Sequence, residues 1–97
     1  RKCAVLGDML ELGEMSGQLH AGVAEYVMKN ADCAFLYGAE MAHCRARLEQ
    51  SGFRVYHSTD KAALTAQLLE WLRPGDAVLF KGSRGMKMEE IAEKVVG

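Results

Sequence analysis

The sequence lacks the features that define several large classes of protein. No apolar run reaches the roughly 20 residues that a membrane-spanning helix needs, and no charged-then-apolar signal segment stands at the start. The net charge is −1 and the pI is near 6.3, so the basic excess expected of a nucleic-acid-binding protein is missing. We therefore expect neither a nucleic acid nor a membrane as a partner.

Proline and cysteine are also scarce. One proline, no internal repeat and no low-complexity segment leave no linker, so residues 1–97 are expected to form a single domain. The chain has three cysteines, Cys3, Cys33 and Cys44. Their odd number and wide spacing argue against a disulfide framework and a metal site, and favour buried thiols in a reducing cytoplasm. Because the first residue is Arg1 rather than methionine, we expect a piece of a longer soluble protein.

Strand-like and helix-like patterns alternate along the chain. Short apolar runs predict strands at residues 3–6, 33–37, 53–56 and 77–80. Apolar residues at helical spacing predict helices from an N-cap at Ser16 to near Asn30, and over residues 41–48, 60–72 and 88–95. The polar third strand is expected at an edge of the sheet, and the continuously apolar fourth strand is expected to be covered on both faces.

The first predicted helix has one apolar side. Leu19, Val23 and Val27 fall on one helical stripe, which we expect to face the sheet. The chain also has three histidines, His20, His43 and His57. None has metal-ligand spacing, and we expect them at surface or helix-packing positions.

The alternation predicts an α/β fold, a Rossmann-like parallel sheet of about four strands with helices on both faces. The simplest doubly wound strand order is third, second, first, fourth. That order places the first and fourth strands side by side where the direction of winding reverses. The loops that follow these two strands would then line one crevice.

The loop after the fourth strand is suited to an anion. Within it, Lys81, Gly82, Ser83 and Arg84 offer fixed cations, a hydroxyl group and accessible backbone donors. A carboxylate or a phosphate fits these groups, and the Arg84 guanidinium can orient a carboxylate through two parallel hydrogen bonds. A glycine-rich turn with solvated charges is the alternative.

The loop after the first strand offers acceptors instead. Gly7 allows close approach of the backbone to a ligand, and Asp8 and Glu11 can accept hydrogen bonds from an ammonium group. Alternatively, Asp8 caps the turn and Glu11 is solvated. Neither loop has the spacing of a phosphate-binding P-loop or of a dinucleotide fingerprint, and no nucleophile stands beside a base.

Four segments carry a resemblance to a known family. In chain order they are residues 5–13, 19–20, 75–76 and 79–89. Together they resemble the C-terminal domain of the cytoplasmic Mur ligases, most closely the MurF type, which adds D-alanyl-D-alanine to UDP-N-acetylmuramoyl-tripeptide. The resemblance implies an enzyme with a domain for the UDP-sugar peptide, a central ATPase domain, and this domain, which binds the dipeptide and closes over the active site.

The resemblance also implies which groups lie elsewhere in such an enzyme. In the family, the ATP phosphate loop, the magnesium ligands and a modified lysine belong to the central domain. The full-length enzyme is thus expected to use ATP and magnesium, whereas this chain alone is expected to bind neither tightly and to be inactive. Relatives that add meso-diaminopimelate carry Lys-Gly-His-Glu where this chain has residues 81–84, so Arg84 is expected to face the dipeptide carboxylate.

Two other functions stay open from the sequence. A stand-alone flavodoxin- or receiver-like module would bind a small anion or a partner protein in isolation. A purely structural domain would tolerate changes at Ser83 and Arg84 without a kinetic effect.

Overall fold

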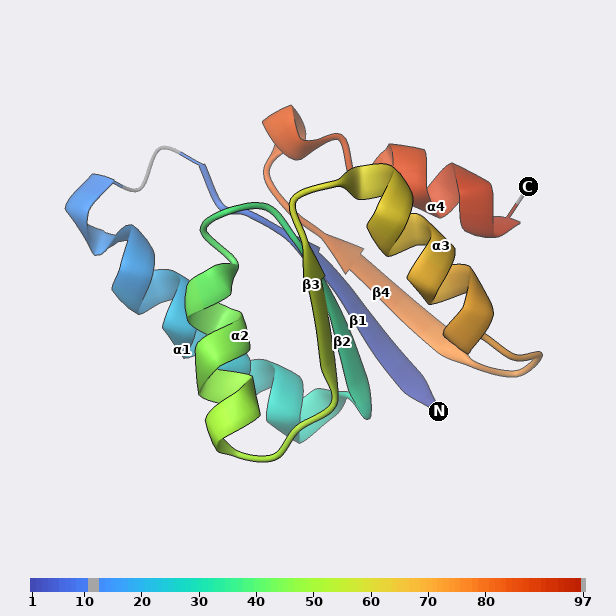
Figure 1. Ribbon diagram of the computed structural model, residues 1–97, viewed down its shortest axis with the longest axis horizontal. Helices are drawn as coiled ribbons and strands as arrows, with labels where there is room; N and C mark the ends of the chain where they lie inside the picture. Colours follow the sequence, from blue (N-terminus) through green and yellow to red (C-terminus); the bar gives the residue numbers. More distant parts are fainter. Residues whose placement is uncertain (11–12, 97) are drawn as a thin grey trace.

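Four parallel strands form one sheet in the order β3-β2-β1-β4 (Figure 1). A computed structural model of the chain describes residues 1–10 and 13–96. The strands are β1 (Lys2–Gly7), β2 (Cys33–Tyr37), β3 (Val55–Ser58) and β4 (Ala77–Lys81). The predicted order is confirmed, because β1 pairs directly with β4 and places Cys3 opposite Val78 and Val5 opposite Phe80. The carboxyl ends of β1 and β4 therefore lie side by side.

Helices cover both faces of this sheet. They are α1 (Ser16–Asn30), α2 (Ala42–Gln50), α3 (Lys61–Trp71) and α4 (Glu89–Val96), with short 3-10 turns η1 (Gly13–Met15) and η2 (Arg84–Met86). Figure 1 shows α1 and α2 on one side of the strands and α3 and α4 on the other. The α/β fold predicted from the alternation is thus confirmed. Asp60 stands at the start of α3, where its carboxylate accepts hydrogen bonds from the amides of Ala62 and Ala63.

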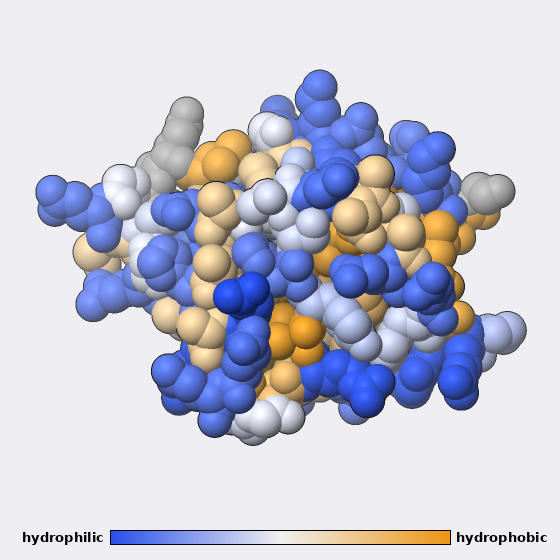
Figure 2. Space-filling model, viewed as in Figure 1, coloured by the Kyte–Doolittle hydropathy of each residue, from blue (hydrophilic) through white to orange (hydrophobic). Residues whose placement is uncertain are grey.

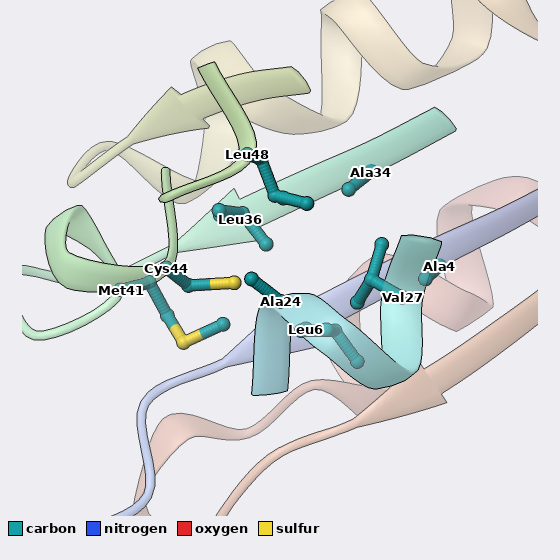
Figure 3. Close-up of a cluster of buried hydrophobic side chains, with 9 residues drawn as sticks. All are labelled: Ala4, Leu6, Ala24, Val27, Ala34, Leu36, Met41, Cys44 and Leu48. Carbon is teal, nitrogen blue, oxygen red and sulfur yellow. The ribbon is translucent and has the colours of Figure 1, made fainter. Parts of the chain in front are cut away.

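Alternate residues of the central strands feed two separate cores. Ala4 and Leu6 of β1 face α1 and α2, in the cluster that Figure 3 shows. Cys3 and Val5 face the other way, into a cluster with buried residues of α3 and α4. All three cysteines are buried free thiols, as the sequence predicted. Successive side chains of a strand point to opposite faces of the sheet, and helices pack on each face here, so β1 and β2 are buried on both sides.

The prediction that the fourth strand is covered on both faces is wrong. Val78 and Phe80 pack against the α3 and α4 core, but Leu79 on the opposite face is 40% exposed. The buried residues of α1 contact the cluster built on β1 and β2, and no described helix lies over that face of β4. A continuous apolar run therefore belongs here to an edge strand.

Two predicted boundaries also need correction. The third strand begins at Val55, two residues later than predicted, because the Phe53 amide donates to the carbonyl oxygen of Leu48 and closes α2 instead. It does lie at a sheet edge, as predicted. Ser16 is not a helix cap, since it is the first residue of α1 and its hydroxyl group donates to Glu40.

The predicted stripe of α1 is correct at Val27, which is buried, and at Val23, which packs against the core, but it is wrong at Leu19. Leu19 is 44% exposed, whereas the buried residues of the helix are Ser16, His20, Ala24 and Val27. Polar groups can replace apolar ones on a buried face when every one of them is hydrogen-bonded. This condition is met for Ser16 and His20, whose partners belong to the candidate site.

On the face that Figure 2 shows, the surface is largely hydrophilic over the helices, and hydrophobic atoms reach it in several smaller patches. Among the large hydrophobic residues, Leu10 and Met15 are 41% and 53% exposed. Among the helices that the structure describes, none has both the length and the apolar character needed to span a bilayer.

Candidate functional site

The loops after β1 and β4 are bonded to each other. The amide of Ser83 donates to the carbonyl oxygen of Asp8 at 3.2 Å, and the Ser83 Oγ accepts from the amide of Leu10 at 2.8 Å. These contacts follow from the parallel pairing of β1 with β4, which brings the two strand ends to the same edge. The two glycine-bearing loops therefore act as one structural unit.

Glycine is required where these loops cross. A Cβ atom on Gly82 would lie 2.8 Å from the Cγ of Met88 and 3.2 Å from the Cα of Gly7. A Cβ atom on Gly7 would lie 2.6 Å from the sulfur of Met88. Close approach to the Gly7 backbone therefore explains Gly82, whereas a side chain at Gly7 would have to displace the Met88 side chain.

A cavity of about 620 Å³ opens beside the paired loops. Four of the predicted site residues line it, namely Gly7, Lys81, Gly82 and Ser83. The rest of its wall is mainly apolar and includes Met9 and Tyr26. A mainly apolar pocket with a few polar groups at one end is typical of a small-molecule site. Asp8 and Arg84 are not among the lining residues.

One cation, Lys81, lines this cavity, and a second, Arg84, follows the lining residue Ser83 in the chain. Lys81 is the last residue of β4 and Arg84 is the first residue of η2, and both are exposed. Within residues 1–10 and 13–96, none of the ion pairs involves either side chain. The Ser83 hydroxyl accepts from Leu10 and still has its own hydrogen to donate. A carboxylate here would meet fixed positive charge and a hydroxyl donor.

Asp8 has a structural partner. Its side chain is 5% exposed, and its carboxylate accepts from the amides of Glu40 and Met41 at 3.1 and 2.8 Å. These amides begin the turn that leads into α2, so the alternative of a capping aspartate describes the observed contacts. Its role as an ammonium ligand stays a prediction. The predicted site residue Glu11 lies outside the described residues.

His20 is a site residue that sequence reasoning missed. Its imidazole is fully buried, with Nδ1 donating to the carbonyl oxygen of Ser16 at 2.7 Å and Nε2 accepting from the Met9 amide at 2.9 Å. The Met9 amide can only donate, so the ring is the neutral Nδ1–H tautomer. The spacing of His20 gave no signal for this role, although the residue belongs to the segments that carry the family resemblance.

The described residues offer neither a reactive thiol nor a metal cluster. Burial raises the pKa of Cys44 to about 11, and hydrogen bonding with Cys33 together with burial raises the pKa of Cys3. The same hydrogen bond lowers the pKa of Cys33, but this thiol is fully buried, so a reagent cannot reach it. Within the described part of the chain, no three His, Cys, Asp or Glu side chains gather as a metal site would need.

Comparison with known proteins identifies the family of this chain. The family model described as "Mur ligase, glutamate ligase domain" matches residues 1–84. The chain belongs to the Mur ligase family. It is 37% identical over 99 residues to the UDP-N-acetylmuramoyl-tripeptide–D-alanyl-D-alanine ligase of Bacillus subtilis, covering 99% of this chain and 22% of that protein. The ligase of the same name from Treponema pallidum is 33% identical, covering 93% of this chain and 20% of the relative.

Solved structures of Mur ligases have the same fold. The domain matches MurF from Acinetobacter baumannii with a TM-score of 0.78 and 25% identity, over 97% of this chain and 22% of that one. It matches the MurF ligase from Thermotoga maritima, solved in complex with ADP, with a TM-score of 0.74 and 27% identity, over 96% and 21%. The resemblance seen in the sequence is thus confirmed. This Mur ligase domain spans about a fifth of the length of these relatives.

Proposed function

We propose that this Mur ligase domain is the C-terminal part of a three-domain, ATP-dependent cytoplasmic ligase. The enzyme would join D-alanyl-D-alanine to UDP-N-acetylmuramoyl-tripeptide in peptidoglycan precursor synthesis. Relatives that cover nearly all of this chain carry that activity in their names. The observation that carries the proposal is the cavity beside the paired loops, which combines an apolar wall with Lys81, Gly82 and Ser83.

The role of the domain in this reaction is to hold the incoming dipeptide. Lys81 and Arg84 supply positive charge for its carboxylate, and the Ser83 hydroxyl supplies a directed donor. The dipeptide amine then attacks the acyl phosphate of the tripeptide, so that an amide bond forms and inorganic phosphate leaves. Holding the amine in line makes this step effectively unimolecular, a gain that reaches about 7–11 kcal/mol in ideal cases.

The residues of this domain do not themselves fit ATP or magnesium. The chain has no P-loop, and the described residues gather no group of three carboxylate or other metal-ligating side chains. We therefore assign ATP and magnesium to the central ATPase domain of the longer protein, and the isolated domain is proposed to be inactive.

Substitution of Arg84 in the full-length enzyme tests the proposal. We expect Arg84→Ala to lower kcat/KM for D-alanyl-D-alanine by about 10- to 150-fold, the effect of losing one charge-assisted hydrogen bond. Arg84→Lys should recover only part of this loss, because an ammonium group cannot reproduce a planar two-point contact. Steady-state kinetics with each of the three substrates varied in turn is the measurement.

Arg45 provides the matched control for this experiment. It is another exposed arginine, on α2, where it pairs with Glu49. Arg45→Ala should leave all three KM values unchanged. If Arg84→Ala also leaves the dipeptide kinetics unchanged, Arg84 is a solvated loop charge and a purely structural role for this domain is favoured.

A further inference from the structure

The imidazole of His20 is held on both sides by backbone groups. It lies on α1 with no exposed surface, and its two ring nitrogens contact the Ser16 carbonyl oxygen and the Met9 amide. The first contact lies within the helix, whereas the second joins the helix to the loop that follows β1. His20 thus connects a rigid element to a loop of the candidate site.

The same loop is held from its other side by Ser83. Leu10, the residue after Met9, donates its amide hydrogen to Ser83 Oγ, and the Ser83 amide donates to the carbonyl oxygen of Asp8. The backbone of residues 8–10 therefore lies between the buried imidazole and the start of the Arg84 turn. Any shift of Met9 away from His20 would also move the atom to which Ser83 is bonded.

A second set of contacts reaches the imidazole through Ser16, whose Oγ atom lies 3.2 Å from His20 Nδ1. The hydroxyl of Ser16 donates to the carboxylate of Glu40 at 2.7 Å, and the Glu40 amide donates to the carboxylate of Asp8. The start of α1, the loop after β1 and the turn before α2 are therefore joined by hydrogen bonds. In the described part of the chain, no buried side-chain nitrogen or oxygen lacks a hydrogen-bond partner.

We propose that His20 is a positioning residue for the incoming dipeptide. Its Nε2 atom fixes the backbone of Met9 and Leu10, and through Ser83 Oγ it fixes the loop that carries Arg84. Without the hydrogen bond from the Met9 amide to His20 Nε2, the loop still carries Arg84 but no longer holds it in position for the carboxylate. The affinity for the dipeptide therefore falls. The inference rests on the proposed function, in which this loop binds the dipeptide carboxylate.

Two conservative substitutions in the full-length enzyme test the inference. His20→Gln places a side-chain oxygen near the position of Nε2 and can still accept from Met9. His20→Asn is shorter, and its amide reaches only the Ser16 carbonyl oxygen. We expect His20→Asn to raise the dipeptide KM by about 2- to 10-fold, the effect of losing one neutral hydrogen bond, while His20→Gln stays near the parent value. The KM values for ATP and UDP-tripeptide should not change.

Val27→Ala controls for a general loss of stability. Val27 is 1% exposed on the same buried side of α1, but it belongs to the apolar cluster and has no link to Ser83. The Val27→Ala substitution should lower the melting temperature without changing any of the three KM values. If His20→Asn does not fold, His20→Leu replaces it, since leucine fills the space without offering an acceptor.

Different results overturn the two proposals. Equal effects of His20→Asn and His20→Gln on the dipeptide KM, an increase of all three KM values together, or the same increase in Val27→Ala would each show that His20 is merely structural. The proposed function fails separately, if the unmodified full-length enzyme forms no amide with D-alanyl-D-alanine.

Discussion

Single glycines decide how closely the segments of this domain approach one another. Gly38 follows β2 with a φ of +115°, and a Cβ atom there would lie 2.5 Å or less from the carboxylate atoms of Asp8. Its position allows that carboxylate to reach the amides of Glu40 and Met41. Gly22 is different, because it lies in α1, where an added Cβ atom would meet no described atom within 4 Å beyond the backbone of its own helix.

Alanine substitutions at these two glycines should have opposite effects. Gly38→Ala should lower the free energy of unfolding by at least about 1–3 kcal/mol, because it strains the backbone and displaces Asp8. Gly22→Ala should raise it by about 0.5–1 kcal/mol, because glycine is a poor helix residue. Urea denaturation of the 97-residue chain measures both. A stable Gly38→Ala variant would mean that Asp8 does not need its present position.

The candidate site was predictable where its signal is local. Lys81 and Arg84 were identified because cations beside glycine directly after a strand are visible in the sequence itself. The bond from Met9 to His20 was not, since it depends on how the loop folds back over α1. The partners of Asp8 lie 32 and 33 residues away, and no spacing rule connects them.

Among the elements, β4 differs on its two faces. Leu79 is 40% exposed on the side of α1, whereas Leu36 of β2 is completely buried in the core of Figure 3. Two leucines in neighbouring regions of one sheet thus contribute very differently to stability. Burial, and not residue type, sets the energy of a substitution.

A pair of substitutions should make this difference measurable. Leu79→Thr should change the free energy of unfolding by less than about 0.5 kcal/mol, because threonine suits a strand and little apolar surface is lost. Leu36→Ala should cost about 2–5 kcal/mol, because it leaves a cavity in the core. Denaturant midpoints of the two variants provide the comparison. A large loss in Leu79→Thr would show that another part of this chain covers β4.

At the element scale, periodicity predicted the type and order of all four strands and four helices. Periodicity predicted element boundaries and burial less well, because tertiary contacts determine these. The start of β3 moved because Phe53 closes α2. In α1, Leu19 is exposed while its neighbour His20 is buried, because the imidazole finds polar partners inside. The prediction that helices cover both faces of β4 was wrong, because an apolar run does not reveal whether a strand is central or lies at the edge of its sheet.

At the scale of the whole molecule, Arg1 ties the start of the chain to the turn before β4. Its guanidinium donates to the Asp76 carboxylate, at 2.8 Å from Nη2, and to the carbonyl oxygen of Trp71. The hydrogen bond from Arg1 holds the pKa of Asp76 at about 2, below the ordinary value of 3.8. The ionised form of Asp76 therefore favours the folded state.

This link predicts a specific acid sensitivity. A carboxyl group with a lowered pKa stabilises the fold above its ordinary pKa and loses that contribution as the pH falls toward the folded value. Stability should thus fall between about pH 4 and pH 2, and Asp76→Asn should remove part of this dependence. Circular dichroism melts across that range test it. An unchanged pH profile in Asp76→Asn would assign the acid sensitivity to other carboxylates.

The isolated domain should not bind ATP tightly on its own. The sequence has no P-loop, the glycine-rich loop whose backbone amides surround the phosphates of a nucleotide. Isothermal titration calorimetry with magnesium and ATP should show no tight binding. A micromolar dissociation constant would instead favour a stand-alone binding module.

The contact between Arg1 and Trp71 has a spectroscopic consequence. The guanidinium lies 3.8 Å from the centre of the indole ring, and Trp71 is the only tryptophan of the 97 residues. Indole emission responds to nearby charge, so the fluorescence of this domain originates at the point where the chain enters its sheet. A shift in that emission would report the release of Arg1 without any added label.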